Sequence, residues 1–161
     1  MSRVILPGTA EWLTARTGAF TASRAPALMA RKKNGEPMEA YSTLIGEIAA
    51  ERLTGNASSH YVTPAMQRGL DLEPEAADAY ALERMVALGD SCLVLHPTLE
   101  RVCATPDRLI GDDGLLEIKC PSVQLKHLDL LKRLKDGTTA EAKLVREYEW
   151  QCHFQIMCTR R

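Results

Sequence analysis

Apolar residues recur three or four positions apart over the first ninety residues and again near the end of the chain, which is the spacing of amphipathic helices. Thr9, Thr21 and Thr63 stand where helix N-caps are expected, and Gly55 is suited to end a helix. The pattern predicts helices over residues 10–16, 22–33, 41–55, 64–89, 122–137 and 139–158.

The apolar period changes to two between residues 92 and 119, where short strands are predicted over residues 92–95, 101–105, 107–111 and 115–119. The order is therefore helices, then a group of antiparallel strands, then helices. This order predicts a layered α/β domain, and we expect residues 1–161 to form one domain.

Two predicted helices have apolar stripes that should face the core. The stripe of the helix over 41–55 is made of Tyr41, Leu44, Ile45, Ile48, Ala49 and Leu53. The stripe of the last helix includes two glutamines, which are unexpected on an inward face, and is made of Leu144, Tyr148, Gln151, Gln155 and Cys158.

The helix over 64–89 carries an acidic residue on its inward side. Its stripe at helical spacing is made of Met66, Leu70, Glu73, Ala77 and Tyr80. Pro74 removes a backbone donor, so we expect a kink or a restart there. A carboxylate in a core is costly unless a cation neutralises it. The alternative is that the helix rotates and leaves Glu73 solvated beside Arg68.

The strands over 107–111 and 115–119 bring a second set of charged residues together. Glu117 and Lys119 share one face of their strand because side chains alternate. A two-residue turn at 113–114 would put Asp107 opposite Cys120, whereas a three-residue loop over 112–114 would put Asp107 opposite Lys119. We favour the three-residue loop, because Gly114 suits the left-handed position that ends such loops. This register gathers two acids and an amine on one face.

Two converging carboxylates repel one another unless a cation lies between them. Oxygen ligands without a nearby histidine favour Mg²⁺ or Mn²⁺ over zinc. The main-chain carbonyl of Ile118 can complete the ligand set of Asp107 and Glu117. Such a site suits phosphodiester cleavage, with Lys119 orienting the attacking water and offsetting transition-state charge.

Composition and charge bear on the nucleic-acid contact, on cysteine-based sites and on the location of the protein. The net charge is −1, yet six basic residues fall within the first 33 positions, so the N-terminal segment is the expected contact with any nucleic acid. Five cysteines without a CxxC pair argue against a disulfide framework and a zinc ribbon. With no apolar run of membrane length and no secretory signal pattern, a cytoplasmic protein is expected, in a bacterial host if the chain is phage encoded.

The pattern "PD…ExK" with the upstream "GLDLEPEAADAY" resembles the PD-(D/E)xK nuclease superfamily, and specifically its lambda-exonuclease-like branch of phage recombination nucleases, the viral recombinases and alkaline exonucleases. The elements "W…R.G..TASR" and "YEWQCHFQIMCTRR" extend the resemblance from Trp12 to the end of the chain. It implies a restriction-endonuclease-like core, a central mixed sheet flanked by helices. Family members continue into at least one further strand and helix after the position of Arg161.

The resemblance also implies roles for single residues. Asp107 and Glu117 would be metal ligands, Lys119 the catalytic lysine, and Glu73 a contributor to a second metal site, so that the counter-charge of Glu73 would be a metal ion. Arg16, Ser23 and Thr105 match positions near the 5′-phosphate of the DNA end. Gln151 is assigned to the active site, where its amide would bind a water on the metal or the scissile phosphate, with His153 and Gln155 as alternatives for that role.

The activity implied is Mg²⁺-dependent 5′→3′ digestion of double-stranded DNA to nucleoside 5′-monophosphates, leaving a 3′ single strand for phage recombination by annealing. A homotrimeric ring and a phage single-strand annealing protein as partner are implied with it. Two rival interpretations remain open: another nuclease on the same core, such as a structure-specific endonuclease, and a non-catalytic protein that binds DNA ends.

Overall fold

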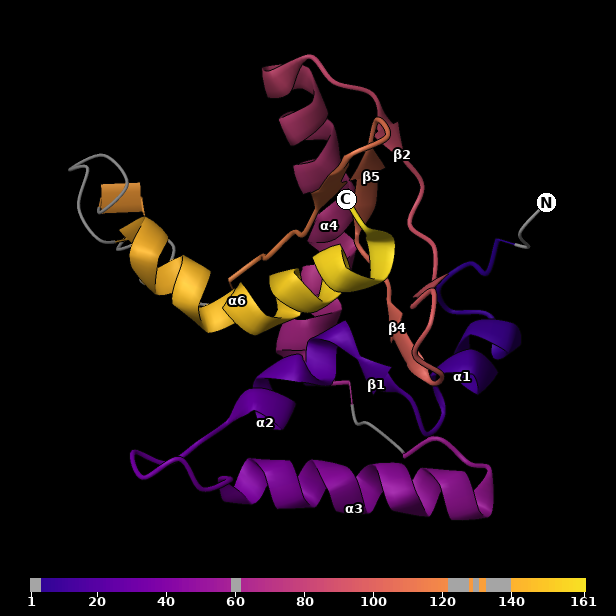
Figure 1. The fold of residues 1–161 in the computed structure, drawn as a ribbon. Helices are drawn as coiled ribbons and strands as arrows, with labels where there is room; N and C mark the ends of the chain where they lie inside the picture. The colour runs from indigo at the N-terminus through magenta and orange to yellow at the C-terminus, as the bar shows by residue number, and fades with distance from the viewer. Residues whose placement is uncertain (1–3, 59–61, 122–127, 129–130, 133–139) are drawn as a thin grey trace.

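The computed structural model describes residues 4–58, 62–121, 128, 131–132 and 140–161, and the predicted helix over 122–137 lies almost wholly outside these residues (Figure 1). The helices are α1 (Ala10–Arg16), η1, a 3₁₀ turn (Ala22–Arg24), α2 (Ala25–Met29), α3 (Glu39–Thr54), α4 (Pro64–Arg84) and α6 (Ala140–Thr159). The strands are β1 (Phe20–Thr21), β2 (Leu88–Gly89), β3 (Val94–Leu95), β4 (Val102–Ala104), β5 (Arg108–Ile110) and β6 (Gly114–Leu116).

Local capping explains where several helices begin and end. The Thr9 hydroxyl accepts the Trp12 N–H at 3.2 Å, and the Thr63 hydroxyl accepts the Met66 N–H at 3.2 Å, so both predicted N-caps are confirmed. Thr21 occupies the N-cap position of η1, but its hydroxyl bonds to Ser23 instead of capping the helix. Gly55 takes a left-handed φ of 68° and ends α3 as predicted.

The strands form two small sheets. In the first, of order β1-β4-β3, β1 runs parallel and β3 antiparallel to β4, while the second, of order β2-β5-β6, is antiparallel. The predicted group of strands is confirmed, with the mixed pairing added by β1 from the N-terminal region. Cys103 and Ala104 of β4 are both fully buried and belong to two separate clusters of the core, so the core is built around β4.

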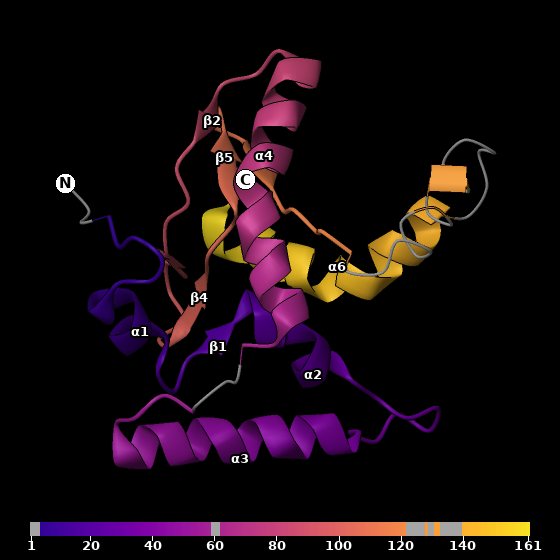
Figure 2. The same ribbon diagram turned by 180° about the vertical axis from the view of Figure 1, so that it is seen from behind.

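Helices surround this strand. Among the closest packed pairs of elements are α6 with α2, η1 and β4, and α2 with α3. In Figure 1, α3 lies along one edge of the molecule with α2 between it and α6. Figure 2 shows α4 running beside β2 and β5 on the other side. No helix in the described part of the chain has the length and apolar character to cross a membrane.

The inward stripes were predicted only in part. In α3, Leu44 and Ile48 are buried as expected, but Leu53 is 87% exposed. In α4, Ala77 is buried while Met66 and Leu70 are more than half exposed, and Met66 lines a cleft instead of the core. In α6, Gln155 and Cys158 are buried, which confirms the unusual glutamine-bearing stripe.

The predicted helix over 64–89 was too long at its end. The helix continues through Pro74 without a restart and stops at Arg84. Met85 adopts a left-handed φ of 52° there, which ends the helix, and Leu88 and Gly89 pair with β5. Pairing with β5 therefore draws Leu88 and Gly89 into a strand, although helical spacing alone assigns them to the helix.

The register of the β5–β6 hairpin also differs from the prediction. Ile110 pairs with Gly114 and Arg108 with Leu116, so the loop is 111–113 and Gly111 takes the left-handed φ of 53°. The physical reason lies at Gly114, where a Cβ would stand 2.9 Å from the Ile110 side chain and carbonyl. Gly114 is therefore required inside the ladder. The correction slides the strands by an even number of residues, so each residue of the ladder keeps its predicted face, although β6 ends at Leu116, before Glu117 and Lys119.

Candidate active site

The charged cluster predicted from the hairpin is confirmed in its geometry. Continuing the observed register by one residue past Arg108 and Leu116 brings Asp107 level with Glu117. The Ile118 N–H donates to Asp107 Oδ2 at 2.6 Å, and Lys119 Nζ is ion-paired with Glu117 Oε1. Asp107, Glu117 and Lys119 therefore converge where β6 ends.

The cluster has more negative than positive charge. The pKa of Asp107 is raised to about 6, first by burial and then by the negative charge of Glu117, with a smaller contribution from Glu73. The Ile118 N–H and the charge of Lys119 act in the opposite direction without cancelling the rise. A cation between the two carboxylates would relieve this repulsion.

Helix α6 holds the carboxylate of Glu117 from the other side. Gln151 Nε2 donates to Glu117 Oε1 and Gln155 Nε2 donates to Glu117 Oε2, each at 2.5 Å. His153 points elsewhere, since its side chain is 63% exposed and lies 3.9 Å from Glu149. Of the three alternatives, the structure brings Gln151 and Gln155 to the cluster and leaves His153 outside.

Gln155 is the most enclosed of these side chains. Its exposed fraction is 0%, and within the described part of the chain its Oε1 atom has no hydrogen-bond partner. A buried acceptor without a partner is costly, so this atom is suited to a water or a hydroxyl donor.

Glu73 lies near the cluster and is paired with Arg108, a partner that the sequence pattern did not predict. Arg108 donates to Glu73 Oε1 at 3.0 Å and to the carbonyl of Asp107 at 2.5 Å. Arg68 bonds the carbonyl of Pro121, which excludes the alternative pairing with Glu73. Strand alternation places Arg108 on the face opposite Asp107, but nothing in the sequence indicates that α4 covers that face.

The oxygen donors of this cluster fit a hard divalent cation. Among the described residues, no group of three or more His, Cys, Asp and Glu side chains is gathered as a ready-made metal site. Mg²⁺ does not need such a group, because it commonly uses one or two carboxylates together with waters and substrate phosphates. Asp107 and Glu117, with the raised pKa of Asp107, meet that requirement.

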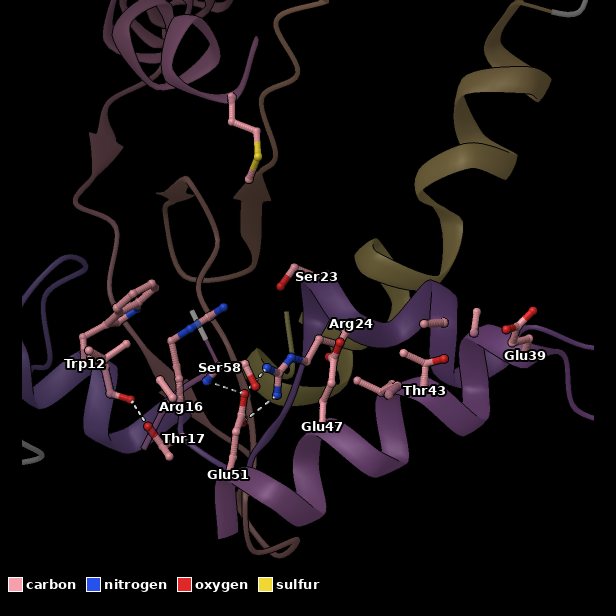
Figure 3. A pocket seen from close by; sticks show the side chains of 16 residues that line it. Trp12, Arg16, Thr17, Ser23, Arg24, Glu39, Thr43, Glu47, Glu51 and Ser58 are labelled. Carbon is pink, nitrogen blue, oxygen red and sulfur yellow. Dashed lines mark hydrogen bonds and ion pairs between the residues drawn. The ribbon is translucent and has the colours of Figure 1, made fainter. Parts of the chain in front are cut away.

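A separate cleft of about 760 Å³ is lined mainly by residues of α1, η1 and α3 (Figure 3). Arg16 and Ser23, two of the residues predicted to contact phosphate, both line it. The third, Thr105, does not line the cleft but contacts a residue that does, because Trp12 Nε1 donates to Thr105 Oγ1 at 3.1 Å. Thr105 is two residues before Asp107, so this hydrogen bond connects the cleft with the carboxylate cluster.

Arg16 is the cation of this cleft that lacks a counter-ion. Its guanidinium lies 4.3 Å from the centre of the Trp12 ring, and within the described residues it has no hydrogen bond or ion pair. Burial lowers the pKa of Arg16 from its usual value, although a guanidinium stays charged at neutral pH. A partly desolvated arginine with unused donors is well suited to bind an anion.

A buried ion pair lines the same cleft and was not anticipated from the sequence. Arg24 donates to both oxygens of Glu51, at 2.5 and 3.0 Å, and the Glu51 side chain is only 2% exposed. Glu51 also accepts the N–H groups of Gly18 and Ser58, at 2.8 and 3.2 Å. Its place next to the apolar stripe of α3 gave no sign of this role, since the partners come from distant segments.

Glu51 is expected to make the protein sensitive to acid. Its pKa is lowered to about 2, chiefly by hydrogen bonds from Arg24, so the stabilisation is present above its ordinary pKa of 4.5 and is lost as pH falls toward 2. The contribution is about 3 kcal/mol. Glu51→Gln should therefore lower the free energy of unfolding at pH 7 and flatten its decline between pH 5 and 2. Urea titrations across this range measure both effects, and an unchanged acid slope in the variant would contradict the assignment.

Comparison with known proteins agrees with this geometry. Residues 11–161 match the model of the YqaJ-like viral recombinase domain. Two crystal structures of LHK-Exo, an alkaline exonuclease from Laribacter hongkongensis, are similar to the chain, with 35% sequence identity. The TM-score is 0.76 for the complex with dAMP and 0.77 for the other structure. Each match covers 95% of this chain and 70% of LHK-Exo. A search of curated proteins found no match. The chain therefore belongs to the YqaJ-like viral recombinase family and has the PD-(D/E)xK nuclease fold of the alkaline exonucleases.

Proposed function

We propose that the chain is a Mg²⁺-dependent exonuclease that digests double-stranded DNA in the 5′→3′ direction and leaves a 3′ single strand for recombination by annealing. The observation that carries this proposal is the hydrogen bond between Trp12 and Thr105, which ties a cleft containing an unpaired arginine to the carboxylate–lysine cluster. A receptor for a terminal phosphate beside a hydrolytic site is what an end-directed nuclease requires.

In this proposal, Asp107, Glu117 and the carbonyl of Ile118 hold the metal ion, and Mn²⁺ can substitute for Mg²⁺. Glu73 contributes to a second ion, in exchange for its present partner Arg108. When bound, the metal polarises the scissile phosphoryl group and lowers the pKa of a water molecule. The neighbouring side chains provide the remaining functions.

Lys119 is placed to act on the attacking water and on the charge of the transition state. Its ammonium group is ion-paired with Glu117 and lies 5.0 Å from the centre of the Tyr148 ring, so its position is fixed from two sides. Gln151 and Gln155 fix both oxygens of Glu117, which leaves the carboxylate little freedom to rotate. These contacts prearrange the site before DNA binds.

Arg16 and Ser23 receive the 5′-phosphate, with Thr105 close by. The guanidinium supplies charged donors and the hydroxyl a further donor, which together suit a phosphate monoester. The complex of the related LHK-Exo with dAMP supports a deoxynucleoside monophosphate as the product. A homotrimeric ring and a single-strand annealing protein as partner remain predictions from the family resemblance.

Arg16→Gln should lower the rate of digestion of a 5′-phosphorylated linear duplex by about 10- to 100-fold, because a charge-assisted contact is removed. Digestion of the 5′-hydroxyl duplex should change little. The assay uses Mg²⁺ and duplexes labelled separately at each 5′ end, and the parent should release labelled mononucleotides early from both. Arg84→Gln removes an exposed arginine at the end of α4, outside the cleft and the N-terminal basic segment, and serves as the matched control.

Circular DNA distinguishes the rival functions in the same assay. Equal cutting of circular and linear DNA by the parent would favour a structure-specific endonuclease. Tight binding of duplex ends without any hydrolysis in Mg²⁺ or Mn²⁺ would favour a non-catalytic end-binding protein.

A further inference from the structure

The turn over residues 17–19, between α1 and β1, is held by side chains from outside it. Glu51 accepts the Gly18 N–H at 2.8 Å, and Arg52 donates from Nε to the Gly18 carbonyl at 2.8 Å. Arg24 donates to the carbonyl of the next residue, Ala19, at 3.3 Å. Two adjacent residues of α3 therefore hold both polar groups of Gly18.

The approach between the turn and α3 is close enough to require glycine. Gly18 has a φ of +67°, and a Cβ at this position would lie 2.5 Å from Arg52 Cγ. The Arg52 guanidinium also lies 5.7 Å from the centre of the Phe20 ring, just beyond the turn. The path of the chain between Arg16 and Ser23 is thus set by α3.

Glu51 has no capacity left to bind a substrate. Its two oxygens accept from Gly18, Ser58 and both terminal nitrogens of Arg24. The ion pair neutralises Arg24, so Arg16 is left as the arginine of the cleft without a carboxylate partner. Figure 3 shows Glu51 and Arg24 directed toward each other, with Arg16 beside the pair and Ser23 above it in this view.

We propose that Glu51, together with Arg52, is a positioning residue for recognition of the DNA end. Glu51 fixes the separation of Arg16 and Ser23 through the Gly18 turn, and it keeps Arg24 from competing with Arg16 for the terminal phosphate. This inference rests on the proposed function, because it assumes that the cleft receives a 5′-phosphate. It assigns no contact with DNA to Glu51 itself.

The test measures the ratio of dissociation constants for short duplexes ending in a 5′-hydroxyl or a 5′-phosphate, by fluorescence anisotropy in EDTA. Glu51→Gln should lower this phosphate preference by about tenfold, since small displacements in a binding constellation have large effects. Arg52→Lys keeps the charge, loses the directed Nε contact and should lower the preference by about threefold. Glu36→Gln removes a carboxylate from the exposed Lys32–Glu36 pair and should leave the preference unchanged.

A general loss of structure is excluded by a second readout at the carboxylate cluster. The rise in melting temperature on addition of Mg²⁺ should be the same in Arg52→Lys as in the parent. Arg52 is exposed, so we expect Arg52→Lys to fold. This variant therefore tests the positioning role even if Glu51→Gln fails to fold.

The outcomes separate this inference from the proposed function. If Arg16→Gln loses the phosphate preference while Arg52→Lys and any folded Glu51→Gln keep it, the positioning role is overturned and the phosphate site stands. If the parent itself does not distinguish phosphate from hydroxyl ends, 5′-phosphate recognition fails and the inference fails with it.

Discussion

Replacement of Lys119 by methionine is expected to lower DNA hydrolysis by about 10²- to 10⁴-fold, the range for removing a charge-stabilising or proton-handling side chain from an active site. Methionine keeps most of the side-chain volume but cannot pair with Glu117 or interact as a cation with Tyr148. Binding of duplex ends in EDTA should change by less than about threefold, because in the proposed function the terminal phosphate binds in the separate Arg16 cleft. Single-turnover digestion in Mg²⁺ combined with anisotropy in EDTA measures the two effects independently.

Lys132→Met is the matched control for this variant. Lys132 is exposed and lies outside the N-terminal basic segment, so its loss should leave the rate of hydrolysis unchanged. Full activity of Lys119→Met would contradict the assignment of the cluster as the hydrolytic site. An equal loss of end binding and of hydrolysis would instead place Lys119 among the DNA contacts.

Asp107→Asn is expected to abolish hydrolysis and, at the same time, to stabilise the metal-free protein. The pKa of Asp107 is raised to about 6 from an ordinary 3.8, so its ionisation opposes folding as pH rises from about 4 through 6. Asparagine removes that opposition and should raise the free energy of unfolding at pH 7.5 in EDTA by about 2 kcal/mol, after allowance for solvent screening. In thermal melts in EDTA between pH 4 and 8, the melting temperature of the variant relative to that of the parent should increase as pH rises.

Mg²⁺ should reverse the order of stability. It should raise the melting temperature of the parent but not of Asp107→Asn, because the variant lacks one of the proposed ligands. Asp112→Asn, in the exposed loop of the same hairpin, is the control and should follow the parent in both conditions. A variant that is less stable than the parent in EDTA at pH 7.5 would show that the hydrogen bond from Ile118 outweighs the cost of burial together with the repulsion by Glu117.

Patterns within short segments were sufficient for much of the fold. Caps at Thr9, Thr63 and Gly55 act through neighbouring backbone groups, so the sequence alone determined where those helices begin or end. The order of the long helices and of the strands after residue 92 followed from the apolar period, whereas β1 and β2 were not predicted. The convergence of Asp107 with Glu117 followed from side-chain alternation, and it survived a wrong hairpin register because the error was an even number of residues.

The tertiary structure alone decided which distant groups meet. Arg108 as the partner of Glu73, Arg24 as the partner of Glu51 and the pair Gln151 and Gln155 around Glu117 all join segments at least 27 positions apart. The end of α4 at Arg84 likewise depended on a partner strand for Leu88 and Gly89. Local spacing determines which face of a helix or strand a side chain occupies. Which oppositely charged residue it meets depends on how the helices and strands pack together. For this protein, the sequence determined the kinds of residue at the site, and packing determined which of them hold one another in place.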